Sequence, residues 1–298
     1  MKAARRRLLQ YAFIALVFAV TSCHRASRSS DGANGAQRVV SLSPSTTEIL
    51  FAVGAGQRVV GRTQFCDFPP EASALPVVGG FVDANLEEIM RLSPDLVVGA
   101  RGPAGPALAS KLESLGIATL FPSTQSIAEI EAAISNIAAR VGATERGQAL
   151  VTSMRAREKA VAGAVSGEPR VRTLLVFGLA PIVVAGPESF PNEMLVRANG
   201  ENVMKSGGAY PVINAETLVT LDPEVIINGA ASGRGGENRN IDREAQGWRE
   251  LRAVREGRVV PLVDEAALRP GPRTAEGIVT IAHILHPRAN LDPPLAPR

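Results

Sequence analysis

Residues 85–98 read NLEEIMRLSPDLVV, and the pattern returns at residues 214–227 as NAETLVTLDPEVII. The two stretches align without a gap at an offset of 129 residues (214 − 85), with identical Asn, Glu, Leu and Pro positions. Each copy predicts a short helix, a turn at the proline and an apolar strand. Solenoid units recur every ~20–50 residues, so one repeat at this longer period predicts two similar lobes instead. Glu87 and Glu216 would then occupy the same position in each lobe; chance likeness of two helix–turn–strand units is the alternative.

The first 23 residues predict a secretory signal peptide. Basic side chains at residues 2–7 precede a short apolar stretch over residues 8–20, which is too short to span a bilayer comfortably. Small residues then lead to Cys23, as in signals that are cleaved before a lipid-modified cysteine. An ordinary signal peptide with an incidental cysteine is the alternative. We therefore expect a periplasmic lipoprotein, anchored to the membrane through Cys23 and followed by a flexible linker over residues 24–37.

The positive charge of the chain lies mostly in this first segment. The whole chain has a formal net charge of +3, and residues 1–23 carry four basic and no acidic side chains, so the remainder carries −1 (3 − 4). Nucleic-acid binders rely on a basic surface to contact phosphates. We therefore expect no nucleic-acid partner.

Neither a metal site nor a catalytic set assembles from the sequence. The histidines are His24, His283 and His286. They do not form a zinc-binding pattern, and acylation of Cys23 would leave Cys66 as the only thiol, without a disulfide partner. Ser43 precedes a predicted helix but has no histidine partner, and the Gly-rich run at 233–238 lacks the Gly-Lys-Ser/Thr of a phosphate loop. We expect no metal, no cofactor and no catalytic residue; a periplasmic enzyme is the alternative from another class.

Strands and helices alternate along the chain after residue 38, which is typical of an α/β fold. Residues 144–164 interrupt this alternation with one long helix dominated by helix-forming residues. The predicted fold class is α/β, with two similar lobes, each with a central, mostly parallel sheet, joined by this stiff connector. Small lobe motions are expected rather than wide hinge closure. The expected divisions are an N-terminal lobe (38–143), a connector helix (144–166), a C-terminal lobe (167–287) and a tail (288–298).

Aromatic residues are scarce, at 4% of the chain, and several lie in loops beside Gly or Pro. Phe81 and Tyr210 each precede their repeat Glu by six residues (87 − 81 and 216 − 210), so they occupy equivalent positions in the two lobes. Together with Phe65, these rings would suit a large, flat, partly apolar ligand at the strand ends, where α/β folds bind ligands. The alternative is that each ring packs into the core of its own lobe.

The loop RPGPR at residues 269–273 combines two arginines with stiff turn residues. An arginine here could donate several hydrogen bonds to amide or carboxylate groups of a ligand. We assign Arg269 to the ligand and Arg273 to the structure, where it would begin the last helix and bridge to an acidic side chain on the surface.

The chain resembles the helical-backbone class of periplasmic substrate-binding proteins, which serve ATP-driven importers of cobalamin, haem and iron-siderophores. The resemblance spans nearly all of residues 38–287 and is carried by RVVSLSPSTTE at 38–48, TQFCDFP at 63–69, both repeats and RPGPR at 269–273. Within the class, the loop at 63–69 is most similar to that of the cobalamin-binding members.

This resemblance implies a ligand and two partners. Phe65, Phe81, Tyr210 and Arg269 match positions that contact the corrinoid in cobalamin-binding members. Glu87 and Glu216 match glutamates that dock onto arginines of the paired permease subunits, which work with an ATPase. The alternative for both glutamates is that they merely begin helices beside Asn caps.

One departure from the pattern of the cobalamin-binding members leaves the identity of the ligand undecided. Val183 stands where an additional aromatic residue is found in well-described cobalamin binders. Haem binders usually ligate iron through Tyr or His, and Tyr210 is the only tyrosine of the expected mature chain. A haem or iron-siderophore binding protein is therefore the alternative within the class, and a ligand-sensing lipoprotein without a permease is a further one.

Overall fold

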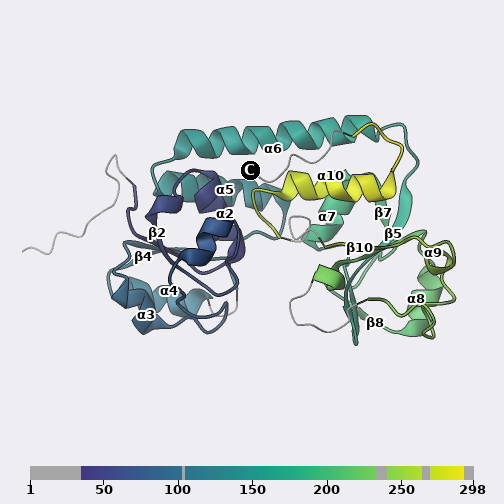
Figure 1. Ribbon diagram of the computed structural model, residues 1–298, viewed down its shortest axis with the longest axis horizontal. Helices are drawn as coiled ribbons and strands as arrows, with labels where there is room; N and C mark the ends of the chain where they lie inside the picture. The colour runs from purple at the N-terminus through teal and green to yellow at the C-terminus, as the bar shows by residue number, and fades with distance from the viewer. Residues whose placement is uncertain (1–34, 103–104, 233–239, 264–268, 292–298) are drawn as a thin grey trace, which may run out of the picture. The chain divides into compact units, whose positions relative to one another are not determined.

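The computed structural model describes residues 35–102, 105–232, 240–263 and 269–291. The predicted signal peptide, Cys23 and the end of the predicted tail lie outside these ranges. We call residues 35–140 the N-terminal half and residues 171–291 the C-terminal half. Each half contains one sheet with helices packed on it, and one long helix contacts both halves (Figure 1).

The N-terminal half is built on a four-stranded parallel sheet with the order β2-β1-β3-β4. Its strands are β1 (Val39–Ser41), β2 (Val59–Arg62), β3 (Leu96–Val98) and β4 (Ala118–Leu120). Its helices are α2 (Pro44–Ala52), α3 (Leu86–Arg91), α4 (Gly105–Ser114) and α5 (Ile127–Arg140), with short 3-10 turns at Gly56–Arg58 and Pro70–Ala74. Val39 packs with residues of α2 and α5, whereas Val40 packs with residues of α3 and α4. Both faces of the sheet are buried, so its strands are apolar runs without alternation.

The C-terminal half contains a six-stranded mixed sheet with the order β10-β9-β5-β6-β8, and β7 pairs with β5. Its strands are β5 (Val171–Leu179), β6 (Ile182–Val184), β7 (Gly200–Asn202), β8 (Val212–Ile213), β9 (Val225–Asn228) and β10 (Val259–Pro261). Its helices are α7 (Phe190–Arg197), α8 (Ala215–Leu221), α9 (Arg252–Arg255) and α10 (Thr274–Leu285), with a 3-10 turn at Gly229–Ser232. The pairs of β5 with β7 and β9, and of β9 with β10, are parallel, whereas β6 and β8 extend the sheet in antiparallel fashion.

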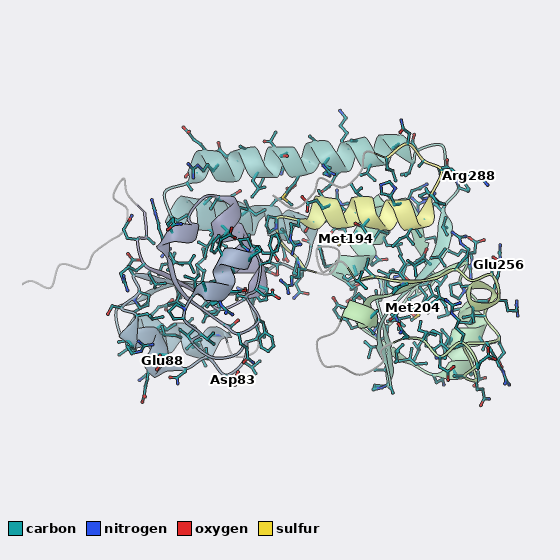
Figure 2. All side chains as sticks on the ribbon, viewed as in Figure 1. Asp83, Glu88, Met194, Met204, Glu256 and Arg288 are labelled. Carbon is teal, nitrogen blue, oxygen red and sulfur yellow. The ribbon has the colours of Figure 1, made fainter. Side chains whose placement is uncertain are left out.

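The long helix α6 (Thr144–Ala164) has the bounds that the sequence predicts. It packs against α5 of the N-terminal half and against α10 of the C-terminal half (Figure 1). Met154 and Val161 of α6 belong to one buried cluster that includes residues of both halves. Beneath α10, the fully buried Met194 of α7 belongs to the same cluster (Figure 2). A shared core of this kind gives a stiff joint, because close-packed side chains resist displacement.

The sequence repeat is also a structural repeat. The α3–β3 unit and the α8–β9 unit each begin at an Asn whose side-chain oxygen accepts backbone N–H groups of the first turn. The turn after each helix places a non-glycine residue at positive φ, Ser93 at 47° and Asp222 at 33°. These two residues are 129 apart (222 − 93), so even the strained turn is duplicated.

The tertiary contacts of the two units are duplicated as well. The carboxylate of Asp95 accepts the backbone N–H of Arg38 at 3.0 Å, and that of Glu224 accepts the backbone N–H of Arg172 at 3.2 Å. Both arginine side chains then donate to a carbonyl at the end of the repeat helix. The repeat therefore reflects two similar lobes rather than a chance likeness of local sequence.

Three elements differ from the sequence-based expectation. Residues 248–254 predict a helix, but only Arg252–Arg255 are helical, and Trp248 is buried before that helix begins. The strands β7 and β8 have no counterpart in the prediction, because Gly200–Asn202 is polar and Val212–Ile213 is only two residues long. Neither segment has the apolar run or alternation by which strands are recognised in a sequence.

Candidate functional site

Phe81 lies where the strands of the N-terminal sheet end. A small apolar pocket of about 90 Å³ is lined by Phe81 together with residues that come one or two positions after three parallel strands. These residues are Leu42 after β1, Ala100 after β3 and Phe121 after β4. Phe81 nevertheless remains 42% exposed. Its ring is therefore supported on one side by the sheet edge and still presents surface to a ligand, at the edge where α/β folds bind ligands.

Tyr210 lies at the equivalent edge of the C-terminal sheet. Its ring meets that of Phe177, in the second half of β5, edge to face, with centroids 5.7 Å apart and planes at 87°. Gly229, directly after β9, adjoins the same Phe177 ring, since a Cβ at this glycine would lie 3.0 Å from it. Tyr210 is 51% exposed. The packing still removes enough water from the phenol to raise the pKa of Tyr210 above its ordinary value of 10.0, so the hydroxyl is protonated at neutral pH.

Phe65 projects from the loop after β2 and is 42% exposed. The next residue, Cys66, is fully buried as a free thiol, with its sulfur 3.2 Å from the Thr63 hydroxyl. The backbone of Gln64 donates to the carbonyl of Gly79, two residues before Phe81, at 3.0 Å. Anchored on both sides, this loop holds Phe65 outward and ties it to the segment that carries Phe81.

Arg269 belongs to a buried ion-pair network. Its Nη1 donates to Oδ1 of Asp67 at 2.9 Å and to Oε1 of Glu48 at 3.3 Å. Glu48 also accepts two bonds from Arg273, one on each carboxylate oxygen and both at 2.8 Å. The Glu48 side chain is 2% exposed and that of Arg269 is 16% exposed. Glu48 lies on α2 and both arginines precede α10, so the network joins the two halves.

This network changes the predicted roles of the two arginines, one of which was assigned to the ligand and the other to the structure. Arg273 begins α10 as expected, but the acid that it pairs with, Glu48, is buried and not on the surface. Its guanidinium carbon also lies 3.9 Å from the centre of the Phe68 ring, a cation–π contact. Arg269 shares the same carboxylate partner and therefore has a structural role as well. Its role toward a ligand stays a prediction. Glu48, Asp67 and Phe177 are the residues that sequence reasoning missed.

A larger cavity of about 590 Å³ lies beside this network and is lined by Glu48, Phe68 and Arg273, among others. None of the four predicted ligand residues lines it. This cavity is therefore separate from the strand edges at which Phe81 and Tyr210 lie.

Glu87 and Glu216 are both exposed in the first turns of α3 and α8, each two residues after its capping asparagine. Within the described part of the chain, no ion pair involves either of them. The neighbouring Glu88, by contrast, pairs with Arg91 at 2.6 Å and lies at the margin of the N-terminal half (Figure 2). Acidic residues at a helix N-terminus are stabilised by the helix dipole, so their positions suit both helix initiation and docking.

Two further features bear on the class of protein. Among the residues that the structure describes, no three His, Cys, Asp or Glu side chains are placed to hold a metal ion together. Within the same ranges, no helix combines the length and hydropathy that crossing a membrane requires.

A family model described as periplasmic binding protein matches residues 39–266, and the chain belongs to this family. A vitamin B12-binding protein of Salmonella typhimurium is 31% identical over 239 residues, covering 80% of this chain and 86% of the relative. The predicted class is thus confirmed: this is a two-lobed α/β binding protein of the type that includes vitamin B12, haem and siderophore binders.

Two solved structures show how far the likeness extends. The periplasmic vitamin B12 binding protein of Vibrio cholerae is 27% identical, with a TM-score of 0.71, and the match covers 84% of this chain and 97% of that one. A periplasmic haem-binding protein of Pseudomonas aeruginosa is 26% identical, with a TM-score of 0.74, and the match covers 87% and 96%. The fold is therefore shared with binders of two different macrocycles, and the ligand must be argued from the site.

Proposed function

We propose that this protein captures a corrinoid, namely cobalamin or a close relative, and delivers it to an ABC permease. The observation that carries the proposal is the pair formed by Phe81 and Tyr210. These residues are equivalent in the repeat, and each is supported by its own sheet edge while about half exposed. Vitamin B12-binding relatives at about 30% identity support this ligand class.

The two rings suit a large macrocycle for physical reasons. An aromatic side chain contributes a wide apolar surface at low cost in conformational entropy, and Tyr adds a hydroxyl for a polar group at the ligand's edge. Phe177 braces Tyr210, and the residues after three strands support Phe81, so little ordering is required on binding. Phe65 adds a third exposed ring, and Arg269 adds a donor for amide groups.

The comparison with haem concerns Tyr210. A tyrosine that ligates haem iron must act as an electron-pair donor, most effectively as a phenolate. The ring of Tyr210 is held edge to face against Phe177, and burial raises the pKa of its phenol. A corrinoid already holds its cobalt in the macrocycle and needs only contact and hydrogen bonds from the protein. Haem and iron-siderophores remain the ligands against which the proposal is tested.

A thermal-shift comparison tests the ligand class. The purified mature protein is heated with cyanocobalamin, haemin or a ferric hydroxamate siderophore at equal concentrations. A ligand present at about 100 times its Kd stabilises the folded state by about 2.7 kcal/mol, equivalent to a rise in Tm of roughly 5–10 °C. We expect the Tm to rise with cyanocobalamin and not with haemin or the siderophore. A rise with haemin or the siderophore, and none with cyanocobalamin, would overturn the proposal.

We propose further that Glu87 and Glu216 dock the loaded protein onto a permease dimer. Two equivalent exposed carboxylates on one chain suit a partner that presents the same basic surface twice. Charge pairs of this kind speed the encounter of two proteins and fix how they are aligned in the complex. Charge reversal of both residues should impair transport in reconstituted vesicles while cyanocobalamin binding persists. Glu88→Lys is the control, because it makes the same charge change one residue away. Unimpaired transport by the doubly reversed protein would exclude the docking role.

The proposed location follows from the first residues of the chain. We propose that Cys23 is acylated and tethers a periplasmic binding protein, with no catalytic role, to the membrane. Metabolic labelling with a fatty acid should mark the wild-type protein but not Cys23→Ala. Equal labelling of both proteins would show that the anchor lies elsewhere.

A further inference from the structure

The two repeat helices expose an apolar side chain at the same position. Met90 of α3 is 39% exposed and Val219 of α8 is 40% exposed, and the two residues are 129 apart (219 − 90). Each comes three residues after a glutamate, Glu87 or Glu216, whose carboxylate forms no ion pair with any described residue. Residues at this spacing share one face of a helix, with Cβ atoms about 5–6 Å apart. Each half therefore presents a carboxylate and an apolar side chain next to each other.

The other polar side chains of the two helices add no net charge to these surfaces. On α3, Glu88 pairs with Arg91 at 2.6 Å, so these two charges neutralise one another. On α8, the uncharged Thr217 and Thr220 stand at the equivalent positions. Single exposed apolar side chains are common on proteins. Here, however, two helices of different composition present the same combination, which is what two equivalent contacts with one partner require.

The two helices lie on the faces of their sheets that are turned away from α6. Ile89 of α3 belongs to the buried cluster of Val40, and Leu218 of α8 belongs to that of Leu174. The helix α6 contributes to the cluster on the opposite face of each sheet. Figure 1 accordingly shows α3 and α8 on the side away from α6. A partner on this side could contact both surfaces without meeting the connector helix.

We propose that Met90 and Val219 are the apolar centres of two equivalent docking surfaces, and that each inserts into an apolar recess of the permease dimer. This inference rests on the proposed docking role of Glu87 and Glu216 and extends it. It defines the partner surface by its chemistry, as a basic side chain and an apolar recess within one helical turn of each other, present twice.

The charged and the apolar side chains should control different rate constants. Attraction between charges acts before contact, raises the association rate and weakens as salt is added. An apolar side chain that is buried only in the complex mainly lowers the dissociation rate, and salt affects this contribution much less. Kinetic measurements at several salt concentrations can therefore separate the two contributions.

The test measures binding of the protein, with cyanocobalamin present, to the permease–ATPase complex in nanodiscs. The double variant Met90→Ser/Val219→Ser should dissociate about tenfold faster or more, while its association rate and salt dependence stay as in the wild type. Met90→Leu/Val219→Ile should keep the wild-type dissociation rate, because it keeps the apolar surface. The matched control is Leu115→Ser/Val196→Ser, which truncates one side chain of similar exposure in each half and should change neither rate.

The possible results separate the role of the apolar side chains from that of the glutamates. An unchanged dissociation rate in Met90→Ser/Val219→Ser, with slowed association after charge reversal of Glu87 and Glu216, would overturn this inference alone. Wild-type association by the charge-reversed protein, or absence of any complex, would refute the docking role and this inference with it.

Self-association is the other use to which these surfaces could be put. If the wild-type protein forms dimers in analytical ultracentrifugation and Met90→Ser/Val219→Ser abolishes them, the surfaces bind a second copy of this chain, and the inference is wrong. Exposed substitutions of this kind should change the stability little. If the double variant fails to fold, which thermal unfolding would reveal, the two single variants provide the same test.

Discussion

Replacing the buried Glu48 by glutamine is expected to destabilise the protein markedly. The Glu48 carboxylate is 2% exposed and accepts bonds from both Arg269 and Arg273. Glutamine keeps the shape and one acceptor oxygen but removes the negative charge between two shielded guanidinium groups. Removing one partner from a buried ion pair costs about 3–5 kcal/mol. Because Arg269 keeps Asp67 and Arg273 keeps Phe68, the lower end, about 3 kcal/mol, is expected.

Equilibrium unfolding in urea and a thermal melt measure this loss. For a domain of this size, 1 kcal/mol corresponds to about 2–4 °C, so the Tm should fall by roughly 6–12 °C. The control is Glu71→Gln, whose exposed side chain should change the stability by less than about 0.5 kcal/mol. If Glu48→Gln loses less than about 1 kcal/mol, the network does not join the two halves energetically, and the reasoning is wrong.

The remaining predictions concern the aromatic rings of Phe81 and Tyr210, the asparagine caps of α3 and α8, and the phenol of Tyr210. Phe81→Ala and Tyr210→Ala should each weaken cyanocobalamin binding by about tenfold or more in calorimetry, since each removes an aromatic anchor; normal affinity in both variants would exclude the site. Asn85→Ala and Asn214→Ala should each cost about 1 kcal/mol in urea unfolding, because each cap satisfies first-turn N–H groups; a large loss in only one copy would contradict the equivalence of the two units. Tyr210 is the only tyrosine after residue 23, so the phenolate absorbance of the mature protein titrates it alone. Its midpoint should lie above pH 10.0, and the stability contributed by the neutral phenol should disappear as the pH rises through that midpoint; a midpoint below 10.0 would contradict the desolvation of the phenol.

The architecture could be predicted because its signals are local. The repeat at residues 85–98 and 214–227 appears as two α–β units with matching caps, turns and anchoring arginines. The long helix of residues 144–164 was equally clear, since a helical composition persists over many turns. Short polar strands such as β7 lack any such pattern, and their pairing is decided by the neighbouring strand β5.

The site could be predicted only in part. Phe81 and Tyr210 were singled out because a repeat makes equivalent positions visible in one sequence. The sequence does not single out Phe177, because this residue lies within an apolar strand, where an aromatic side chain cannot be told from a core residue. The pairing of Glu48 with arginines 221 and 225 residues away depends on how α2 and the loop before α10 pack, which no local pattern contains.

Calorimetric titration of the mature protein with cyanocobalamin tests the central claim most directly, with the Phe81→Ala/Tyr210→Ala double variant as its partner measurement. The account predicts saturable binding of one corrinoid per wild-type chain and a loss of affinity of about a hundredfold or more in the double variant. No heat with the wild-type protein at tens of micromolar, or equal affinity in the two proteins, would contradict it.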